Sequence, residues 1–224
     1  MFKRLIRAMA LKHGLTACFM AKPFADQAGS GMHMHVSVQD RDGNNLFAAD
    51  DPAGSPMLRH AIGGLQKTMA ESMLIFAPNA NSYRRFRHQS YAPMAPTWGI
   101  NNRSVSLRVP AGAPASRHIE HRVSGADANP YLVAATVLAG VHAGITAKLD
   151  PGPPITGNGY GSGIAASLPR DWLGALRAAE SSTFLSEALG EAFLRALVAI
   201  KTQEWDKYHA LVPTTDHDWY LDSV

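Results

Sequence analysis

Two histidines stand two residues apart in a segment whose apolar and polar residues alternate. His33 and His35 lie within residues 32–38, and an extended chain would turn both imidazoles toward the same face. Such a pair suits one metal ligand and one phosphate contact, although a His-x-His pair alone is more often structural or incidental. Gly29 and Gly31, just before the pair, would let a ligand come close to the backbone. The segment is therefore a candidate binding site.

A block of arginines follows further along the chain. Between Ser82 and Arg122 there are seven arginines and a single acidic residue, Glu120. The planar guanidinium fork binds carboxylate and phosphate groups at fixed geometry, so the block indicates an anionic ligand, with a solvated basic face as the alternative. We do not expect nucleic acid, because groove binding usually shows lysines with exposed aromatic residues. The seven are Arg84, Arg85, Arg87, Arg103, Arg108, Arg117 and Arg122.

Glu120 is the single acidic residue among these arginines, and a bound cation or an ion pair would explain its position. A divalent metal is one explanation, with Glu120 and His33 as its ligands. An ion pair with Arg122 or Arg117 is the other. Residues 118–123 alternate in character, so Glu120 and Arg122 share one face of a predicted strand. The residues alone leave both explanations open.

The surrounding pattern predicts the elements that carry these side chains. Residues 103–109 alternate as a strand, which places Arg103 and Arg108 on opposite faces. A Ser-Pro cap at Ser55 begins a helix whose apolar spacing continues up to Pro78. The predicted helices are 2–13, 56–77, 129–147, 170–179, 183–189 and 191–211; the predicted strands are 16–21, 32–38, 103–109 and 118–123, with a hairpin turn at 42–45 and a loop at 151–163.

The composition suits a soluble globular domain. The chain has 224 residues, of which 46% are hydrophobic and 17% charged, and a net charge of +3. Its longest apolar run, from Tyr131 to Ile145, falls short of the roughly 20 residues of a membrane span, so we expect a helix buried nearly all round and no membrane association. A single cysteine, Cys18, and the lack of a hydrophobic signal stretch predict a cytoplasmic protein.

Five short segments together resemble the glutamine synthetase superfamily in order and spacing. They extend over nearly the whole chain and correspond to the C-terminal half of that family's subunit. The resemblance implies an α+β fold, with antiparallel strands backed by helices, and one partial catalytic domain over residues 1–224. The segments are Gly29-Ser30-Gly31-Met32-His33-Met34-His35-Val36-Ser37, Asn81-Ser82-Tyr83-Arg84-Arg85, Asn102-Arg103-Ser104 with Arg108-Val109-Pro110, Ile119-Glu120-His121-Arg122, and Asn129-Pro130-Tyr131-Leu132.

The resemblance implies an ATP-dependent ligase. The γ-phosphoryl group of ATP passes to the side-chain carboxylate of glutamate, and an amine then displaces phosphate from the acyl phosphate. His33 and Glu120 match ligands of the Mg²⁺ or Mn²⁺ ion that bridges the ATP phosphates, and His35 and Ser37 match nucleotide contacts. Phosphoryl transfer needs little covalent help, so metals and arginines would act by positioning and by neutralising charge.

Glycine and arginine positions take separate roles in this resemblance. Gly29, Arg85 and Arg122 match positions that hold glutamate. Arg103 and Arg108 match positions that stabilise the phosphates, and Arg103 is the catalytic residue that the resemblance implies. Their predicted placement on opposite faces of one strand does not agree with this shared role.

Two positions depart from the family pattern. Glutamine synthetases carry a glutamate after the motif that ends in Arg85, where it shields the intermediate and helps to deprotonate ammonium, whereas this chain has Tyr91 there. An aromatic residue is compatible with an alkyl amine, so the chain resembles the γ-glutamylpolyamine synthetase branch; packing is the alternative role for Tyr91. His118 stands where an arginine is common, so we expect Arg117 to make that ATP contact.

The resemblance also implies residues that this sequence does not contain. The family's double metal site takes most of its carboxylates from sequence upstream of the matching part, and two protein ligands are few for a hard cation. We therefore expect the N-terminal β-grasp domain and the first part of the catalytic domain to be missing, and a homo-oligomer or the missing half to complete the site. Three functions stay open: a ligase joining glutamate to a polyamine or other alkyl amine, a glutamine synthetase using ammonium, and a non-catalytic nucleotide- or anion-binding remnant.

Overall fold

One small mixed sheet lies at the centre of the site-bearing half of the molecule. A computed structural model describes residues 1–87, 90–160 and 168–224, and its described strands follow the order β1-β4-β3-β2. β4 pairs antiparallel with β1 and β3, as predicted, whereas β2 pairs parallel with β3 and was not predicted. The strands are β1 (Met34–Val36), β2 (Trp98–Ile100), β3 (Leu107–Val109) and β4 (Ile119–His121).

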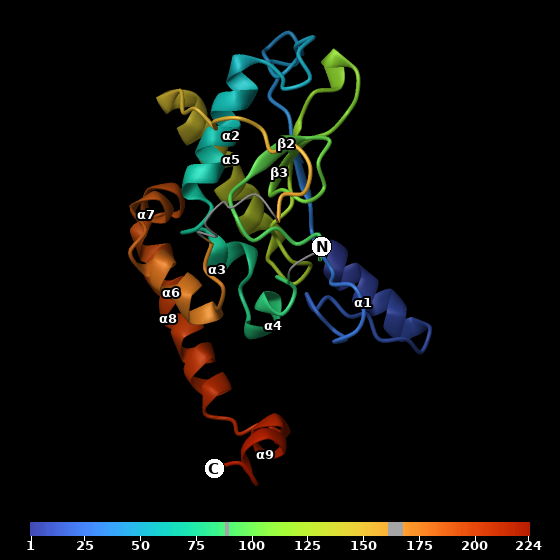
Figure 1. The fold of residues 1–224 in the computed structure, drawn as a ribbon, viewed down its shortest axis with the longest axis vertical. Helices are drawn as coiled ribbons and strands as arrows, with labels where there is room; N and C mark the ends of the chain where they lie inside the picture. The colour runs from blue at the N-terminus through green and yellow to red at the C-terminus, as the bar shows by residue number, and fades with distance from the viewer. Residues whose placement is uncertain (88–89, 161–167) are drawn as a thin grey trace.

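Helices cover one side of this sheet and extend away from it. In Figure 1, α2 and α5 lie beside the sheet, α6, α7 and α8 form a further layer, and α1 and α9 project at separate ends. The helices are α1 (Phe2–Lys12), α2 (Pro56–Thr68), α3 (Met73–Phe76), α4 (Ala80–Tyr83), α5 (Pro130–Ala147), α6 (Trp172–Glu180), α7 (Thr183–Leu189), α8 (Glu191–His209) and α9 (Thr214–Tyr220), with a 3₁₀ turn at Pro114–Ser116.

Hydroxyl side chains end α2 before its apolar repeat is complete. Ser55 caps the helix by accepting the amide of Leu58 at 3.3 Å, as predicted. The Thr68 hydroxyl donates to the carbonyl of Gly64 at 3.0 Å, and the Ser72 hydroxyl donates to the carbonyl of Thr68 at 2.7 Å. Such bonds compete with the helical ladder, and the chain turns before α3 begins. The prediction of one continuous helix through this segment is therefore wrong.

Three glycines allow α2 and α5 to pack backbone against backbone. A Cβ at Gly64 would overlap the carbonyl of Gly140 and the backbone of Gly144. Asn129 caps α5 by accepting the amide of Tyr131 at 3.0 Å. By length and composition α5 could cross a membrane, but a third of it is buried, and its glycine face packs on α2 like that of a core helix.

Several predicted elements differ from the observed ones. Residues 16–21 form no strand, and the predicted strand 103–109 is extended only over β3. The helix α5 is not buried all round, since Tyr131 is 68% exposed and Leu138 is 55% exposed. The hairpin turn is confirmed by the bridge between Gln39 and Asn45. The part of the predicted 151–163 loop beyond residue 160 lies outside the described residues.

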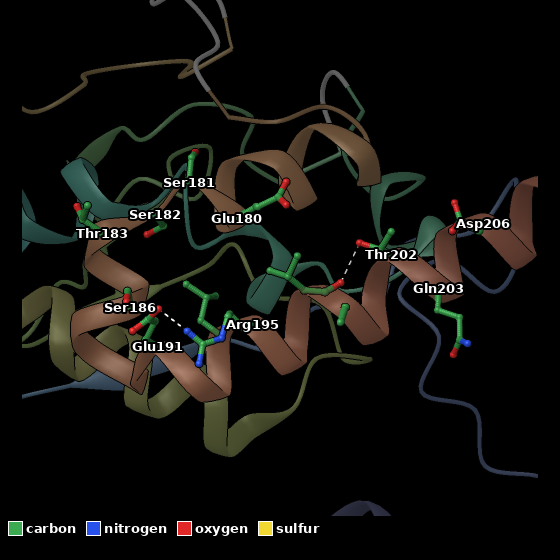
Figure 2. A pocket seen from close by; sticks show the side chains of 13 residues that line it. Glu180, Ser181, Ser182, Thr183, Ser186, Glu191, Arg195, Thr202, Gln203 and Asp206 are labelled. Carbon is green, nitrogen blue, oxygen red and sulfur yellow. Dashed lines mark hydrogen bonds and ion pairs between the residues drawn. The ribbon is translucent and has the colours of Figure 1, made fainter.

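A large groove lies away from the predicted site. Figure 2 shows this groove of about 870 Å³, whose floor is α8 and whose rim carries hydroxyl and acidic side chains from the end of α6 and from α7. Arg195 and Glu191 pair across one turn of α8 there, both largely exposed. Every predicted site residue belongs instead to the sheet and its adjoining loops.

Candidate active site

Glu120 stands at the centre of a buried ion-pair cluster on the sheet. It lies on β4 opposite His35 of β1 and Arg108 of β3, and its residue exposure is 3%. Its Oε2 accepts a hydrogen bond from Arg108 at 2.7 Å, and its Oε1 accepts one from Arg122 at 2.8 Å. The Nδ1 atom of His33 lies 2.9 Å from the same Oε1. The predicted pair with Arg122 is present, and Arg108 is the second cation rather than Arg117.

The cluster sets the protonation of its members. Burial raises the pKa of Glu120, but the charge of Arg122 and the hydrogen bond and charge of Arg108 outweigh it and leave that pKa below its usual value. Burial, with the charge of Arg122, lowers the pKa of His33 although Glu120 opposes the shift. At neutral pH the site therefore holds a carboxylate beside a neutral imidazole, which is the form in which both groups bind metals.

Three arginines and Glu120 line one cavity, which we call the charged cavity. Its volume is about 550 Å³, and three arginine charges face a single carboxylate there, which favours an anionic ligand. Arg103 reaches this cavity from the turn that precedes β3, because strand geometry begins only at Leu107. The predicted separation of Arg103 and Arg108 onto opposite faces is thus wrong, because a turn replaces the strand pattern. The lining residues are His33, Tyr91, Arg103, Arg108, Glu120 and Arg122.

A second cavity adjoins the first at two shared residues. It has a volume of about 450 Å³ and shares Tyr91 and Arg103 with the charged cavity. Its other lining residues are polar or aromatic rather than acidic over the described part of the chain: Asn102, Ser104, Asn158 and Tyr160.

Arg85 is buried, and its side chain packs directly against Gly29. Its Nη2 donates to the carbonyl of Val123, and burial lowers its pKa to about 10. A Cβ at Gly29 would lie 2.6 Å from Cγ of Arg85, so only glycine leaves room for this side chain. Gly29 and Arg85, two of the predicted glutamate-binding residues, therefore pack against each other.

The site retains donors that protein atoms do not satisfy. The Nε atoms of Arg85, Arg108 and Arg122 are buried without a hydrogen-bond partner among the described residues. Buried donors of this kind are costly unless a ligand or water meets them. Carboxylate and phosphate oxygens are the acceptors that arginine donors bind most strongly.

Besides Gly29 and Arg85, three more of the predicted site residues do not line either cavity. His35 is exposed, with its ring 5.1 Å from that of His118, and Ser37 is exposed on the same side of the chain. Arg117 is buried elsewhere and donates to the carbonyl of Ala49 at 3.3 Å. The structure therefore gathers His33, Glu120 and four arginines around the site, but it does not bring Arg117 into that group.

Sequence reasoning missed Asn101, Asn158 and Tyr160 near the site. Asn101 has a left-handed backbone, with φ of 45°, and its Oδ1 accepts from Arg108 at 3.0 Å, which fixes that guanidinium. Asparagine tolerates this backbone conformation better than most residues, but nothing in its neighbourhood singles it out. The glycine-rich stretch around Asn158 and Tyr160 predicts a flexible connection, which gave no reason to place it beside an active site.

The donor set fits part of a divalent metal site. His33 and Glu120 supply one imidazole nitrogen and carboxylate oxygens side by side, which suits Mn²⁺ or Mg²⁺ in kind. Within the described ranges no cluster of three or more His, Cys, Asp or Glu residues gathers to complete the coordination. Phosphate oxygens and further residues would have to supply the remaining ligands.

The comparisons with known proteins agree with this geometry. Residues 1–220 match the glutamine synthetase catalytic domain, and the chain belongs to that family. It is 40% identical over 219 residues to γ-glutamylputrescine synthetase of Escherichia coli strain K12, covering 98% of this chain and 46% of that protein. It is 42% identical over 158 residues to glutamate–isopropylamine ligase of a Pseudomonas species, covering 69% of this chain and 34% of that protein.

Glutamine synthetases are also similar, and so are solved structures. The glutamine synthetase of Rhizobium meliloti strain 1021 is 35% identical over 234 residues, which cover 99% of this chain and 53% of that protein. The structure of GmaS with ADP superposes with a TM-score of 0.89 at 33% identity, covering 99% of this chain and 53% of that one. The predicted fold is confirmed, and the chain spans about half the length of the curated relatives it matches.

Proposed function

We propose that this protein takes part in an ATP-dependent ligase reaction that joins the γ-carboxylate of glutamate to an amine. The reaction passes through γ-glutamyl phosphate: a carboxylate oxygen attacks the γ-phosphorus and ADP leaves, then the amine attacks the acyl carbon and phosphate leaves. The observation that carries the proposal is the buried Glu120, held by Arg108, Arg122 and His33 in a cavity of net positive charge. Family membership supplies the reaction class.

The arginines of the cavity account for the phosphoryl step. Arg103 and Arg108 face the cavity from the turn before β3 and from β3 itself, so both can neutralise charge on the transferring group. Because the bond to Asn101 holds Arg108 and the carbonyl of Arg103 accepts from Arg122 at 3.2 Å, these groups are positioned before substrate arrives. Preorganised donors lose little free energy to reorganisation during the reaction.

Arg85 and Arg122 are the proposed glutamate-binding residues. They lie on the buried side of the cluster, and Arg122 donates to Glu120 while its Nη2 reaches the carbonyl of Arg103. A substrate carboxylate would satisfy their Nε donors. His33 and Glu120 would hold Mg²⁺ or Mn²⁺, which supplies charge neutralisation at the ATP phosphates when bound. His35, Ser37 and Arg117 are proposed ATP contacts.

The amine is proposed to be an alkyl amine rather than ammonium. Tyr91 lines both cavities and is 65% exposed, so this chain offers a phenol rather than a carboxylate where we propose that the amine enters. An exposed side chain that lines two cavities is not packing in a core. The names of the putrescine and isopropylamine ligases among the relatives agree with this choice. Additional subunits or a further half-chain would supply the missing metal ligands, in a cytoplasmic assembly.

The test is amine-dependent phosphate release from ATP and glutamate. We expect putrescine and isopropylamine at equal concentration to support more release than ammonium does. The variant Tyr91→Glu restores a carboxylate at this position. We expect the ratio of ammonium-dependent to putrescine-dependent phosphate release to rise by tenfold or more, because one general base typically contributes about 10²-fold or more. Tyr220→Glu on the distant helix α9 is the matched control, and it should leave the ratio unchanged.

Glutamine synthesis is the second candidate, because glutamine synthetases are 35% identical over nearly all of this chain. A strong preference of the unaltered protein for ammonium would establish it and reject the alkyl amine. A nucleotide-binding protein without catalysis is the third. Binding of ATP with no phosphate release under any amine would favour that function over both ligases.

A further inference from the structure

We propose that His35 and His118 form a separate binding site for Zn²⁺, and that a zinc ion held there keeps ATP from His35. The metal site follows from the geometry of the two imidazole rings, whose centroids lie 5.1 Å apart. The effect on ATP rests on the proposed function, in which His35 is an ATP contact. Neither histidine lines the charged cavity or the second cavity.

The strands β1 and β4 bring the two imidazole rings together. In the antiparallel register His35 of β1 stands opposite Glu120 of β4. His118 comes two residues before Glu120, immediately outside the strand. Because alternate residues of an extended chain point to the same face, His118 shares a face with Glu120 and therefore with His35. The two histidines are thus diagonal neighbours across two strands, which long side chains can bridge.

A backbone carbonyl fixes the tautomer of His118. Its Nδ1 atom lies 2.7 Å from the carbonyl oxygen of Ser116. A carbonyl oxygen only accepts hydrogen bonds, so Nδ1 carries a proton and donates it, and the neutral ring keeps its lone pair on Nε2. Histidines that bind metals almost always donate their other ring N–H in this way, which orients the ring and makes the ligating nitrogen more basic. His35 is exposed, so a cation can reach its ring from solvent.

The spacing of the two rings fits one tetrahedral metal ion. Zn–N bonds of about 2.0–2.1 Å, with each ring centroid about 1.1 Å beyond its nitrogen, place the centroids of two ligating imidazoles about 5 Å apart. The observed separation is 5.1 Å. The ring planes are tilted by 46°, so the pair is not a parallel stack. The fold therefore holds these two imidazoles at the separation that a shared ion requires.

The nitrogen donors select the kind of metal. Imidazole suits Zn²⁺, whereas Mg²⁺ prefers oxygen ligands. The pair differs in this respect from His33 and Glu120, which together offer a nitrogen and carboxylate oxygens. Within the described ranges no third His, Cys, Asp or Glu joins the two histidines, so water would fill the other coordination positions. Two protein ligands make a site that binds zinc reversibly, unlike the four ligands of a structural zinc site.

Zinc and ATP would compete for His35. A metal bonded to the His35 ring occupies the nitrogen that we propose for the nucleotide contact. His118, which stands where an arginine is common in the family, supplies the second ligand. A guanidinium has no lone pair for a metal, so His118→Arg should remove the zinc site while leaving His35 free for ATP.

The first experiment measures Zn²⁺ binding to the purified chain by isothermal titration calorimetry, with the exposed Cys18 alkylated. We expect the unaltered chain to bind zinc, and His118→Arg to bind it at least about tenfold more weakly, because even the loss of a partner that orients a ligand costs about 10–100-fold. His217→Arg on α9 is the matched control and should keep the affinity. Circular dichroism checks that each variant is folded.

A further variant separates this pair from the proposed catalytic metal site. His33→Asn removes the histidine beside Glu120, and it should leave the zinc affinity unchanged. On addition of zinc, the ring nitrogen resonances of His35 and His118 should shift in the NMR spectrum. No zinc binding by the unaltered chain, equal affinity in His118→Arg, or a loss of affinity in His33→Asn would overturn the proposal.

The second experiment measures ATP binding in the presence of Mg²⁺, with and without zinc. At a free zinc concentration ten times its Kd, competition should weaken ATP binding to the unaltered chain about tenfold. ATP binding to His118→Arg should not change. Equal weakening in both proteins, which chelation of zinc by ATP alone would give, would reject the competition. Absence of ATP binding in both proteins would reject the proposed ATP contacts, whereas the calorimetry alone decides the zinc site.

Discussion

Replacing Glu120 by glutamine should destabilise the fold as well as the site. The substitution keeps the size of the side chain but removes the one negative charge between Arg108 and Arg122, which lie 2.7 and 2.8 Å from it. Both guanidinium groups are largely buried, so each loses a partner that water cannot replace. Removing one partner of a buried pair costs about 3–5 kcal/mol, and the amide of glutamine still accepts one hydrogen bond, so we expect about 3 kcal/mol.

Urea unfolding followed by circular dichroism measures this loss. The midpoint should fall by about 1 M or more with an unchanged slope, because the folded and unfolded surfaces are alike in the two proteins. Glu191→Gln is the matched control: it breaks a one-turn pair with Arg195 on the exposed face of α8, and we expect a loss of about 0.5 kcal/mol or less. A loss of less than 1 kcal/mol for Glu120→Gln would refute the view that Glu120 neutralises the two arginines in the folded protein.

Two further perturbations test the fold that supports the site. Gly64→Ala should cost about 3 kcal/mol or more in thermal or urea unfolding, because its Cβ would overlap the backbone of Gly140 and Gly144. The control Ala135→Ser, at an exposed position of α5, should cost little. Burial, with the charge of His33, lowers the pKa of His121 to about 3. The unfolded chain therefore binds this proton more readily, so stability is complete above about pH 6.5 and falls by about 2 kcal/mol at pH 5. His121→Leu should flatten the pH dependence by that amount, and an unchanged slope between pH 7 and 5 would contradict it.

The sequence predicted the chemistry of the site better than its geometry. Residue types and spacing placed Glu120 and Arg122 on one face, and the structure confirms their ion pair. Alternation in residues 103–109 gave the wrong register for Arg103, because Asn102 accepts the Ser104 amide at 2.9 Å and stabilises a turn there. A pattern of apolar and polar residues does not reveal a turn that a side-chain hydrogen bond stabilises.

The helix boundaries were likewise predicted only where local hydrogen bonds determine them. Caps at Ser55 and Asn129 predicted two helix starts correctly, because these bonds are local. The end of α2 depends on the hydroxyls of Thr68 and Ser72, which bond to backbone carbonyls four residues earlier, and apolar spacing alone continued the helix past them. The strand β2 was missed because Trp98 and its neighbours pair in parallel with β3, a contact that no short sequence pattern specifies.

Long-range contacts determine where other residues near the site lie. Arg117, a proposed ATP contact, donates to the carbonyl of Ala49, 68 residues away in sequence. Tyr160 was assigned to a flexible connection, yet the turn at Ser104 holds its neighbour Gly159 through a bond that spans 55 residues. Only the folded chain brings such segments together, so neither placement could follow from local sequence.

Transfer of oxygen from glutamate to phosphate tests the central claim most directly. Glutamate labelled with ¹⁸O in its γ-carboxylate would be incubated with the protein, ATP, Mg²⁺ and putrescine, and the released phosphate analysed by mass spectrometry. A γ-glutamyl phosphate intermediate predicts one ¹⁸O atom in each phosphate released, and release only when the amine is present. Unlabelled phosphate, or no amine-dependent release, would contradict the assignment of this site to glutamate activation.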